Sequence, residues 1–152
     1  LTGEAARAHC HAMRARSDAI LVGGGTFRAD APRLDVRLPG LETRSPERWL
    51  LTRGDAPPGW RKLASPAAIR DMADVQYLFV EGGAETARAF VAKGLVDTLL
   101  IYRAPVSVSG CVTSLPEFCA DALGADRQWR RADTRTLGSD TLEVYEAVCS
   151  PE

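Results

Sequence analysis

Two glycine turns stand where this chain could bind a phosphate. The segments 23–26 (Gly-Gly-Gly-Thr) and 81–84 (Glu-Gly-Gly-Ala) directly follow two short runs of β-forming residues, 19–22 and 77–80. Because glycine has no Cβ, the backbone N–H groups of such a turn can approach a pyrophosphate closely, and a helix that starts after the turn adds its positive dipole end. The paired turns therefore predict one phosphate-rich ligand, a nucleotide, held between two strand ends.

Neither turn is a nucleotide fingerprint by itself. Arg28 stands where the G-x-G-x-x-G pattern requires Gly or Ala, and the first turn lacks the G-K-[ST] ending of a P-loop. Taken alone, the first turn is equally well explained as a structural tight turn. Glu81, at the end of the second β-forming run, is explained more simply as a solvated strand end or as the partner of one arginine. The two turns together favour a ligand site, because open α/β sheets bind ligands at the carboxyl ends of their strands.

The charge balance narrows the class of ligand. The chain has 19 Lys and Arg against 20 Asp and Glu, a formal net charge of -1, which excludes the basic footprint of a nucleic-acid binder. Arginine greatly outnumbers lysine, which suits phosphate recognition but is equally explained by codon bias in an Arg- and Ala-rich protein.

The chain carries no membrane, secretion or metal signal. It has no apolar run of about 20 residues and no signal peptide, so we expect a cytoplasmic protein without membrane partners. The cysteines lack C-x-x-C spacing and we expect reduced thiols; they are Cys10, Cys111, Cys119 and Cys149. The run 9–11 (His-Cys-His) is no metal site, because adjacent residues on a helix diverge and no second ligand pair is evident.

Strands and helices are expected to alternate along the chain. The apolar run at 19–22 does not alternate with polar residues, which is typical of a strand covered on both faces. The elements expected are helices from residue 2 to about 16, at 66–72 and at 84–93, strands at 49–52, 77–81 and 97–108, a long irregular connection after the first turn, and a hairpin of 129–136 with 141–148. This order predicts an α/β fold with a mixed, mostly parallel sheet flanked by helices and a C-terminal antiparallel hairpin. A length of 152 residues with 45% apolar composition suits one domain.

The combined motifs resemble the reductase domain of bacterial bifunctional riboflavin-biosynthesis proteins. The resemblance rests on 14–26 (RARSDAILVGGGT) and 28–34 (RADAPRL), with agreement at 80–85 (VEGGAE) and along 95–105. It extends over about residues 1–108 and returns at the final hairpin. It implies a dihydrofolate-reductase-like fold and a homodimer that uses NADPH to reduce 5-amino-6-(5-phosphoribosylamino)uracil to its ribitylamino product.

The resemblance also implies a cofactor site. By position, the match to the family implies that NADPH is contacted by Thr26, Asp30 and the segment 83–87. Arg53 follows the strand expected at 49–52, where it either meets the 2′-phosphate and favours NADPH over NADH or is only a turn residue. The candidate cofactor residues are Gly23, Gly25, Thr26, Asp30, Arg53, Gly82, Gly83, Ala84, Glu85, Thr86 and Ala87.

The implied substrate site consists of Arg14, Leu34, Arg37 and Glu81. Arg14 and Arg37 can clamp the sugar phosphate through charge-assisted bonds, although without the resemblance they are simply two solvated arginines. Glu81, or less strongly Asp30, is the candidate catalytic residue that binds substrate hydroxyls or manages a proton as the hydride arrives. The residues alone do not choose between these two roles.

Some features depart from the family pattern. The opening strand and the deaminase signature, H-x-E with P-C-x-x-C, do not occur, so we expect residues 1–152 to be a single reductase domain without its natural N-terminal strand and deaminase partner. Asp30-Ala31-Pro32 stands where the family often has Asp-Asp-Pro or Asp-Asn-Pro, and 106–112 differs from the family's glycine-rich segment. Two alternatives stay open: a reductase of another pterin, carbonyl or imine substrate, and a non-catalytic nucleotide-binding or assembly module.

Overall fold

The computed structural model describes residues 2–105 and 129–148, which form parts of two compact units. The parallel-sheet unit comprises residues 8–93. The hairpin unit comprises residues 1–7 together with 94–152. Within the described residues no helix is long and apolar enough to cross a membrane.

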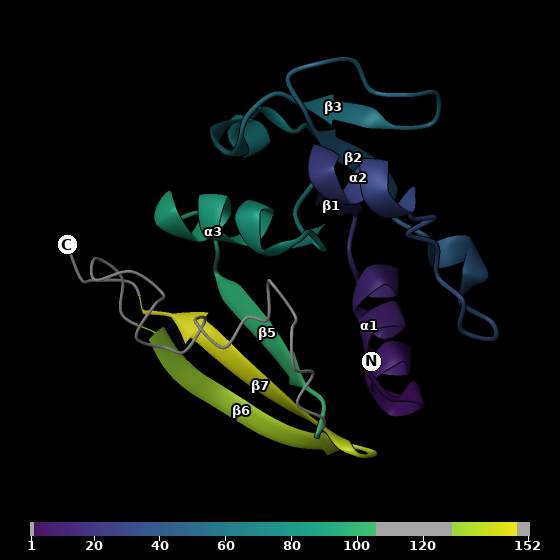
Figure 1. The fold of residues 1–152 in the computed structure, drawn as a ribbon, viewed down its shortest axis with the longest axis vertical. Coiled ribbons are helices and arrows are strands. Elements are labelled where there is room, and N and C mark those ends of the chain that lie inside the picture. Colours follow the sequence, from purple (N-terminus) through teal and green to yellow (C-terminus); the bar gives the residue numbers. More distant parts are fainter. Residues whose placement is uncertain (1, 106–128, 149–152) are drawn as a thin grey trace. The chain divides into compact units, whose positions relative to one another are not determined.

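A four-stranded parallel sheet organises the parallel-sheet unit (Figure 1). Its strands are β1 (Ala19–Gly23), β2 (Glu47–Leu51), β3 (Arg61–Leu63) and β4 (Leu78–Val80), in the order β3-β2-β1-β4. Every residue of β1 is buried. The prediction of a strand covered on both faces is therefore confirmed.

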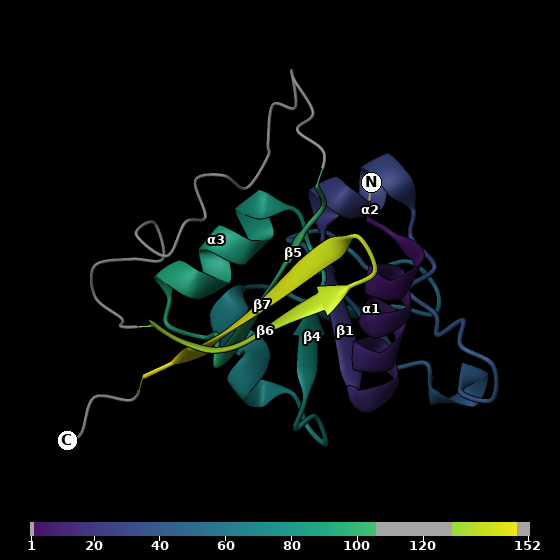
Figure 2. The same cartoon turned by 90° about the horizontal axis from the view of Figure 1, so that it is seen from below.

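The strand order reverses at the β1–β4 pair. The chain steps outward from β1 to β2 and β3, and then returns across β1 to form β4. Figure 2 shows β4 beside β1. Leu21 pairs with Val80, and the Glu81 N–H donates to the Leu21 carbonyl at 2.9 Å. The carboxyl ends of β1 and β4 therefore lie side by side, at the kind of switch point where α/β sheets bind ligands.

Five helical segments accompany the strands within residues 2–105 and 129–148. They are α1 (Glu4–Arg16), α2 (Gly24–Asp30), α3 (Ala84–Ala92) and the 3-10 turns η1 (Glu42–Arg44) and η2 (Pro66–Asp71). The expected helices at the N-terminus and at 84–93 are confirmed, whereas the segment expected at 66–72 is a 3-10 helix. The start of the expected irregular connection is instead helical, because α2 begins directly after Gly23 and ends where Ala31 adopts a φ of 40°.

The core of the parallel-sheet unit fixes the segment after α2. Its buried members and the aromatic residues packed against them are Ile20, Val22, Leu34, Leu50, Phe27, Trp60 and Phe79. Leu34 has a left-handed φ of 55°, which costs a leucine about 1–2 kcal/mol. Burial of the Leu34 side chain, only 3% exposed, offsets that cost and anchors the backbone that follows.

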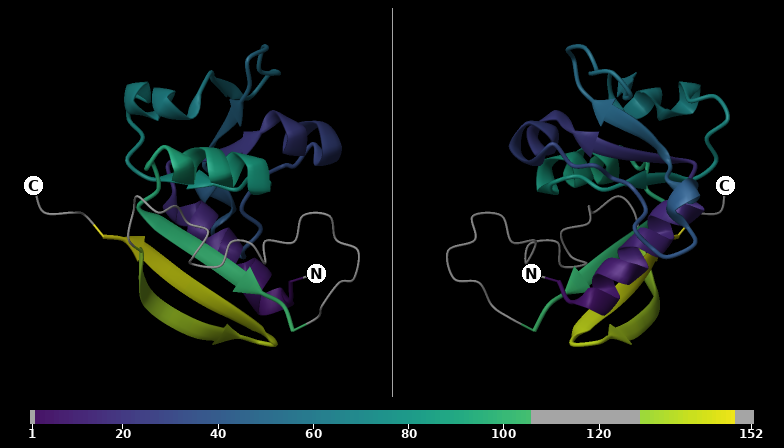
Figure 3. Two further views of the ribbon diagram at one scale, coloured as in Figure 1. Left: turned by 60° about the vertical axis from the view of Figure 1, so that its left-hand side comes forward. Right: turned by 90° about the vertical axis from the view of Figure 1, so that its right-hand side faces the viewer.

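The hairpin unit holds the antiparallel strands. They are β5 (Thr98–Arg103), β6 (Trp129–Leu137) and β7 (Asp140–Ala147), with β7 between the other two (Figure 3). The expected C-terminal hairpin is confirmed. The α/β class is confirmed as well, with the parallel and the antiparallel strands hydrogen-bonded in separate sheets. Residues 106–108 of the strand expected at 97–108, and the segment 109–112, lie outside the described residues.

A buried carboxylate ties the hairpin to the start of α1. Asp140, at the hairpin turn, is 1% exposed. Its Oδ2 accepts the Gly3 N–H at 2.7 Å, and its Oδ1 accepts the Ser139 hydroxyl at 3.1 Å. Gly3 directly precedes α1, so Asp140 satisfies a backbone donor at a helix end that has no intrahelical partner.

We expect Asp140→Ala to lower the free energy of unfolding by about 1–2 kcal/mol, the usual cost of losing a helix cap. Urea unfolding followed by circular dichroism measures the change. Asp71→Ala is the matched control, because Asp71 is exposed and its side chain has no hydrogen bond or ion pair within the described residues. Equal stability of the two variants would contradict the capping role.

Candidate functional site

The two glycine turns meet around one threonine. Gly23 ends β1, Gly82 follows β4, and Thr86 lies in the first turn of α3. A Cβ on Gly82 would stand 2.8 Å from the Thr86 Cβ, and a Cβ on Gly23 would overlap the Thr86 Oγ1. Real Cβ atoms essentially never come within 3.0 Å of such neighbours. The close packing of α3 on both strand ends therefore requires glycine at both positions.

A hydrogen bond joins the same two turns a second time. The Gly83 N–H donates to the Thr26 Oγ1 at 3.2 Å, which links the first turn of α2 to the start of α3. A Cβ on Gly25, by contrast, would meet nothing within 4 Å. The predicted association of the turns is present, and open space lies beside Gly25 for a ligand that approaches the backbone.

The remaining candidates of the second turn lie at the start of α3. Ala84, Glu85, Thr86 and Ala87 form its first turn, and the Ala87 N–H donates to the Gly83 carbonyl at 3.1 Å. The N–H groups of residues 84–86 precede the first intrahelical hydrogen bond, so they are available as donors. This end of α3 suits the phosphates of a dinucleotide, which the neighbouring glycine backbone can approach closely.

Gly23, Gly82 and Thr86 form a glycine cradle, and next to it Arg14 and Glu81 form a bidentate ion pair. The Arg14 Nε lies 2.8 Å from the Glu81 Oε2 and its Nη2 lies 2.5 Å from the Oε1. The Arg14 Nη1 donates to the Asp35 carbonyl at 2.9 Å. Arg14 is thus buried, with a partner at each of its three side-chain nitrogens, rather than a solvated surface arginine, and Glu81 is the partner of an arginine.

The electrostatics of Arg14 favour this pair. Burial on its own would lower the pKa of the Arg14 guanidinium, but the hydrogen bonds and charge of Glu81 outweigh burial, so the pKa is raised. Because Glu81 immediately precedes Gly82, this ion pair lies one residue from the glycine cradle.

The other candidate substrate residues differ from Arg14. Arg37 is on the surface, with its side chain 64% exposed and its Nε 3.6 Å from the Asp35 Oδ1. The Leu34 side chain lies in the core, so only its backbone is left to face a ligand. The two arginines of the expected clamp therefore have unequal roles: Arg14 is buried against Glu81, and Arg37 is open to solvent.

Cys10 lies near the Arg14–Glu81 pair. Burial, followed by the negative charge of Glu81, raises the pKa of the Cys10 thiol to about 11. The thiol is therefore protonated at neutral pH and is not a nucleophile there. The other three cysteines lie outside the described residues.

Asp30 and Arg53 join neither cluster through a hydrogen bond or ion pair. Asp30 ends α2 and is exposed. Arg53 is exposed in the connection after β2, where its carbonyl accepts the Lys62 ammonium at 3.2 Å. Within the described residues neither side chain has a hydrogen-bond or ion-pair partner. Their roles stay predictions.

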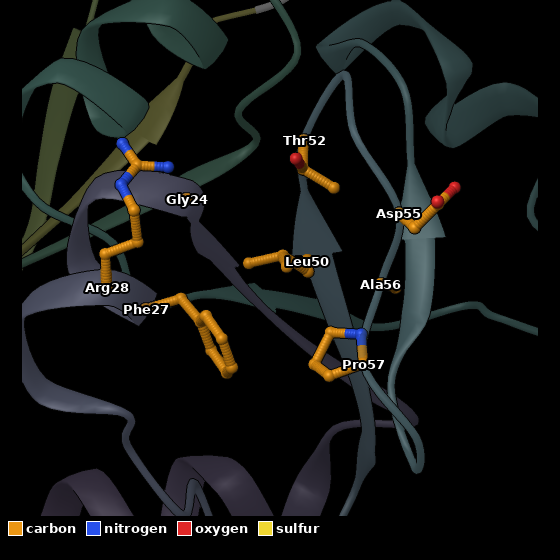
Figure 4. Close-up of a pocket in the computed structure, with 8 residues that line it drawn as sticks. All are labelled: Gly24, Phe27, Arg28, Leu50, Thr52, Asp55, Ala56 and Pro57. Carbon is orange, nitrogen blue, oxygen red and sulfur yellow. The ribbon is translucent and has the colours of Figure 1, made fainter.

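A pocket of about 340 Å³ lies between α2 and the end of β2 (Figure 4). Its lining residues are Gly24, Phe27, Arg28, Leu50, Thr52, Asp55, Ala56 and Pro57. Phe27, Leu50 and Pro57 give it an apolar wall, whereas Arg28 and Thr52 supply polar groups. An apolar surface with a few polar groups is typical of small-ligand sites.

The sequence does not single out Arg28 as a site residue. Arg28 comes one helical turn after Gly24, and its Nη1 lies 3.1 Å from where a Gly24 Cβ would stand. Figure 4 shows the guanidinium beside Gly24 and the Asp55 carboxylate directed away from it. Arg28 has no ion pair within the described part of the chain. The spacing of Gly24 and Arg28 is the sequence signal that could have revealed it, once α2 is known to be a helix.

The family model described as "RibD C-terminal domain" matches residues 1–64 and 60–142. Riboflavin biosynthesis protein RibD of Mycobacterium tuberculosis is 32% identical over 156 residues, covering 93% of this chain and 46% of that protein. Riboflavin biosynthesis protein RibD of Corynebacterium ammoniagenes is 37% identical over 122 residues, covering 70% and 36%. The chain thus spans less than half the length of these relatives.

Solved structures share the fold. Acinetobacter baumannii RibD (form 2) has a TM-score of 0.77 at 22% identity, over 97% of this chain and 52% of that one. A pyrimidine reductase-like protein of Corynebacterium diphtheriae has a TM-score of 0.70 at 13% identity, over 98% and 83%. At these identities the likeness supports the fold alone.

Proposed function

This chain belongs to the family of RibD C-terminal domains, and on that premise we propose that it is an NADPH-dependent reductase of riboflavin biosynthesis. Its substrate is 5-amino-6-(5-phosphoribosylamino)uracil and its product is the ribitylamino compound. One observation carries the proposal: Gly23 and Gly82 close around Thr86, one residue from the Arg14–Glu81 pair. A phosphate cradle and a polar cluster suited to a sugar therefore meet at the switch point of the sheet.

The residues present fit NADPH. The backbone at Gly25 faces open space, and the first turn of α3 offers N–H donors for the pyrophosphate. NADPH, when bound, supplies the hydride for the electrophilic carbon of the opened ribose. The chain contributes binding and orientation. Thr26 holds the two turns together through its bond from Gly83.

The pocket beside Arg28 suits the adenosine end of the cofactor. It lies at the ends of β1 and β2, one strand away from the switch point, which is the side where α/β sheets receive the adenosine ribose. The apolar wall with Phe27 offers a surface for adenine, and Arg28 offers a guanidinium for the 2′-phosphate. Arg28 thus becomes the main 2′-phosphate ligand in this proposal, ahead of Arg53.

We expect Arg28→Ala to weaken NADPH binding by about 10- to 100-fold, the effect of losing a charge-assisted hydrogen bond, and to leave NADH binding nearly unchanged. Titration with each cofactor, followed by nicotinamide fluorescence, measures the change. Arg53→Ala is the matched comparison, with an expected change of less than about threefold, because surface charge pairs contribute little. A larger loss in Arg53→Ala than in Arg28→Ala would reverse the assignment.

In the proposed substrate site the two arginines have different roles. Arg37, exposed beside Asp35, binds the sugar phosphate, and Arg14 holds the Glu81 carboxylate in place. Both Glu81 oxygens already accept from Arg14, so we assign Glu81 to binding a substrate hydroxyl through the remaining lone pairs. Asp30, exposed at the end of α2, is the alternative candidate for handling a proton.

Turnover tests the proposed function. NADPH oxidation on addition of the phosphorylated substrate, with identification of the ribitylamino product, is the expected result. A matched reaction with the dephosphorylated analogue should be slower through a raised KM, because Arg37 then has no phosphate to bind. Equal rates with both would point to another carbonyl or imine substrate, and binding without turnover would point to a non-catalytic module.

Membership of the family is also the basis on which we propose an oligomeric state and a cellular location. We propose that the chain acts as a single reductase domain, in the cytoplasm and as a homodimer. Sedimentation of the purified protein at the mass of one chain would contradict the dimer.

A further inference from the structure

Helix α1 holds the backbone of residues 35–37 through two side chains. The Arg14 Nη1 donates to the Asp35 carbonyl at 2.9 Å, and the Arg37 N–H donates to the His11 Nδ1 at 3.2 Å. His11 and Arg14 are three residues apart, so they share one face of the helix. Leu34, buried in the core, anchors the residue before this segment. The backbone next to Arg37 is therefore fixed at consecutive points.

The contact with Arg37 defines the state of His11. An imidazole nitrogen accepts a hydrogen bond only when it carries no proton, so His11 is neutral and has its proton on Nε2. Once Nδ1 is protonated, it becomes a second donor facing the Arg37 N–H. That protonation would also add a cation beside two arginines.

We propose that His11 is a positioning residue for Arg37: its neutral imidazole latches the Arg37 backbone to α1 and releases it on acidification. The consequence for catalysis rests on the proposed function, in which Arg37 binds the substrate phosphate. The side chain of Arg37 is largely exposed and lies 3.6 Å from the Asp35 Oδ1, and the bond from its backbone N–H to His11 fixes the point from which that side chain extends.

The charged surroundings of His11 agree with this role. Burial, then the positive charges of Arg14 and Arg37, hold the pKa of His11 below its ordinary value. The Asp35 carbonyl and the Glu81 carboxylate act in the opposite direction but are outweighed. Cys10, the neighbouring titratable group on α1, is uncharged at neutral pH. The latch is thus closed at neutral pH and opens as pH falls through the depressed pKa.

Two variants distinguish the loss of the hydrogen-bond acceptor at residue 11 from the loss of a titrating imidazole. His11→Ala removes the acceptor, and we expect the KM for the phosphorylated substrate to rise about 3- to 10-fold with little change in kcat. His11→Asn keeps an oxygen near the position of Nδ1 but does not titrate, so it should retain the wild-type KM. Failure of asparagine to rescue, or a fall in kcat at unchanged KM, would overturn the latch.

The pH profile adds a readout that a purely structural role would not move. The substrate phosphate itself titrates near pH 6, so the His11→Asn profile serves as the baseline. The wild-type KM should follow His11→Asn at neutral pH and approach His11→Ala below the His11 pKa. Parallel wild-type and His11→Asn profiles throughout would contradict the proposal.

Nuclear magnetic resonance tests the latch without turnover. The chain has 2 histidines, so the His11→Asn variant identifies the ring signals of His11. We expect the Nε2–H tautomer, a pKa below about 6.5, and a shift of the Arg37 amide signal that titrates with it. An Nδ1–H tautomer or an ordinary pKa would overturn the latch. A chain with the expected spectra but no turnover would contradict only the proposed function.

Discussion

Replacing Gly23 with alanine is expected to abolish NADPH binding and to lower the free energy of unfolding by about 1–3 kcal/mol. The new Cβ would overlap the Thr86 Oγ1, so the first turn of α3 would have to move away from the end of β1. Gly23 has a φ of -79° and a ψ of 156°, which alanine adopts readily, so the expected cost is steric. Cofactor titration and denaturant unfolding measure the two effects.

A second substitution should relieve the overlap. In Gly23→Ala with Thr86→Ala, the hydroxyl is gone, and the Thr86 Cβ stands 3.5 Å from the new methyl group, an ordinary contact. We expect the double variant to recover most of the stability lost in Gly23→Ala, so that its free energy of unfolding is close to that of Thr86→Ala alone. Gly25→Ala is the stability control, because its Cβ meets nothing within 4 Å. Normal NADPH binding by Gly23→Ala would contradict the cradle, and no recovery in the double variant would contradict the Thr86 contact.

Removing Arg14 is expected to have the other large effect. Arg14→Ala should lower the free energy of unfolding by about 2–3 kcal/mol, because it leaves the Glu81 carboxylate and the Asp35 carbonyl without their donors. It should also raise the KM for the phosphorylated substrate at least about 100-fold, since Glu81 and the 35–37 segment both lose their support. Unfolding and steady-state kinetics measure these changes.

A double-mutant cycle isolates the Arg14–Glu81 pair. Glu81→Gln removes the charge but keeps an amide oxygen as acceptor, so its cost in stability should be smaller than that of Arg14→Ala. Combined with Arg14→Ala, it should add less than its cost alone, because no unpaired carboxylate then remains. Arg33→Ala is the control: Arg33 is 80% exposed and pairs with the Asp35 Oδ2, so little change is expected. Additive costs in the cycle would show that the pair is not coupled.

The sequence alone predicts the local features of the site, but it does not predict which of them contact one another in the fold. The unbroken apolar run of β1 and the glycines after it are local signals, and Glu81 is visible at the end of its own strand. The order β3-β2-β1-β4, by contrast, depends on pairing between residues far apart in sequence. That order brings Gly23, Gly82 and Thr86 together, so their contact cannot be predicted from local sequence patterns.

There are physical reasons why α2 and β3 could not be predicted from the sequence. Helix α2 begins with two glycines, which have poor helix propensity, so its sequence gives no helix signal. Strand β3 has 3 residues, too few for a period to show. Arg28 could not be assigned to the pocket without α2, and the left-handed backbone of Leu34 is held by core packing rather than by a turn residue.

The dinucleotide site itself can be tested by titrating the folded chain with NADPH and NADH and following nicotinamide fluorescence. We expect saturable binding that favours NADPH and is lost in Gly23→Ala, because the proposed site places the phosphates against the joined glycine turns. Cooperative unfolding of the same sample verifies that the chain is folded. Absence of binding by that folded chain would contradict the claim that these turns form a dinucleotide site.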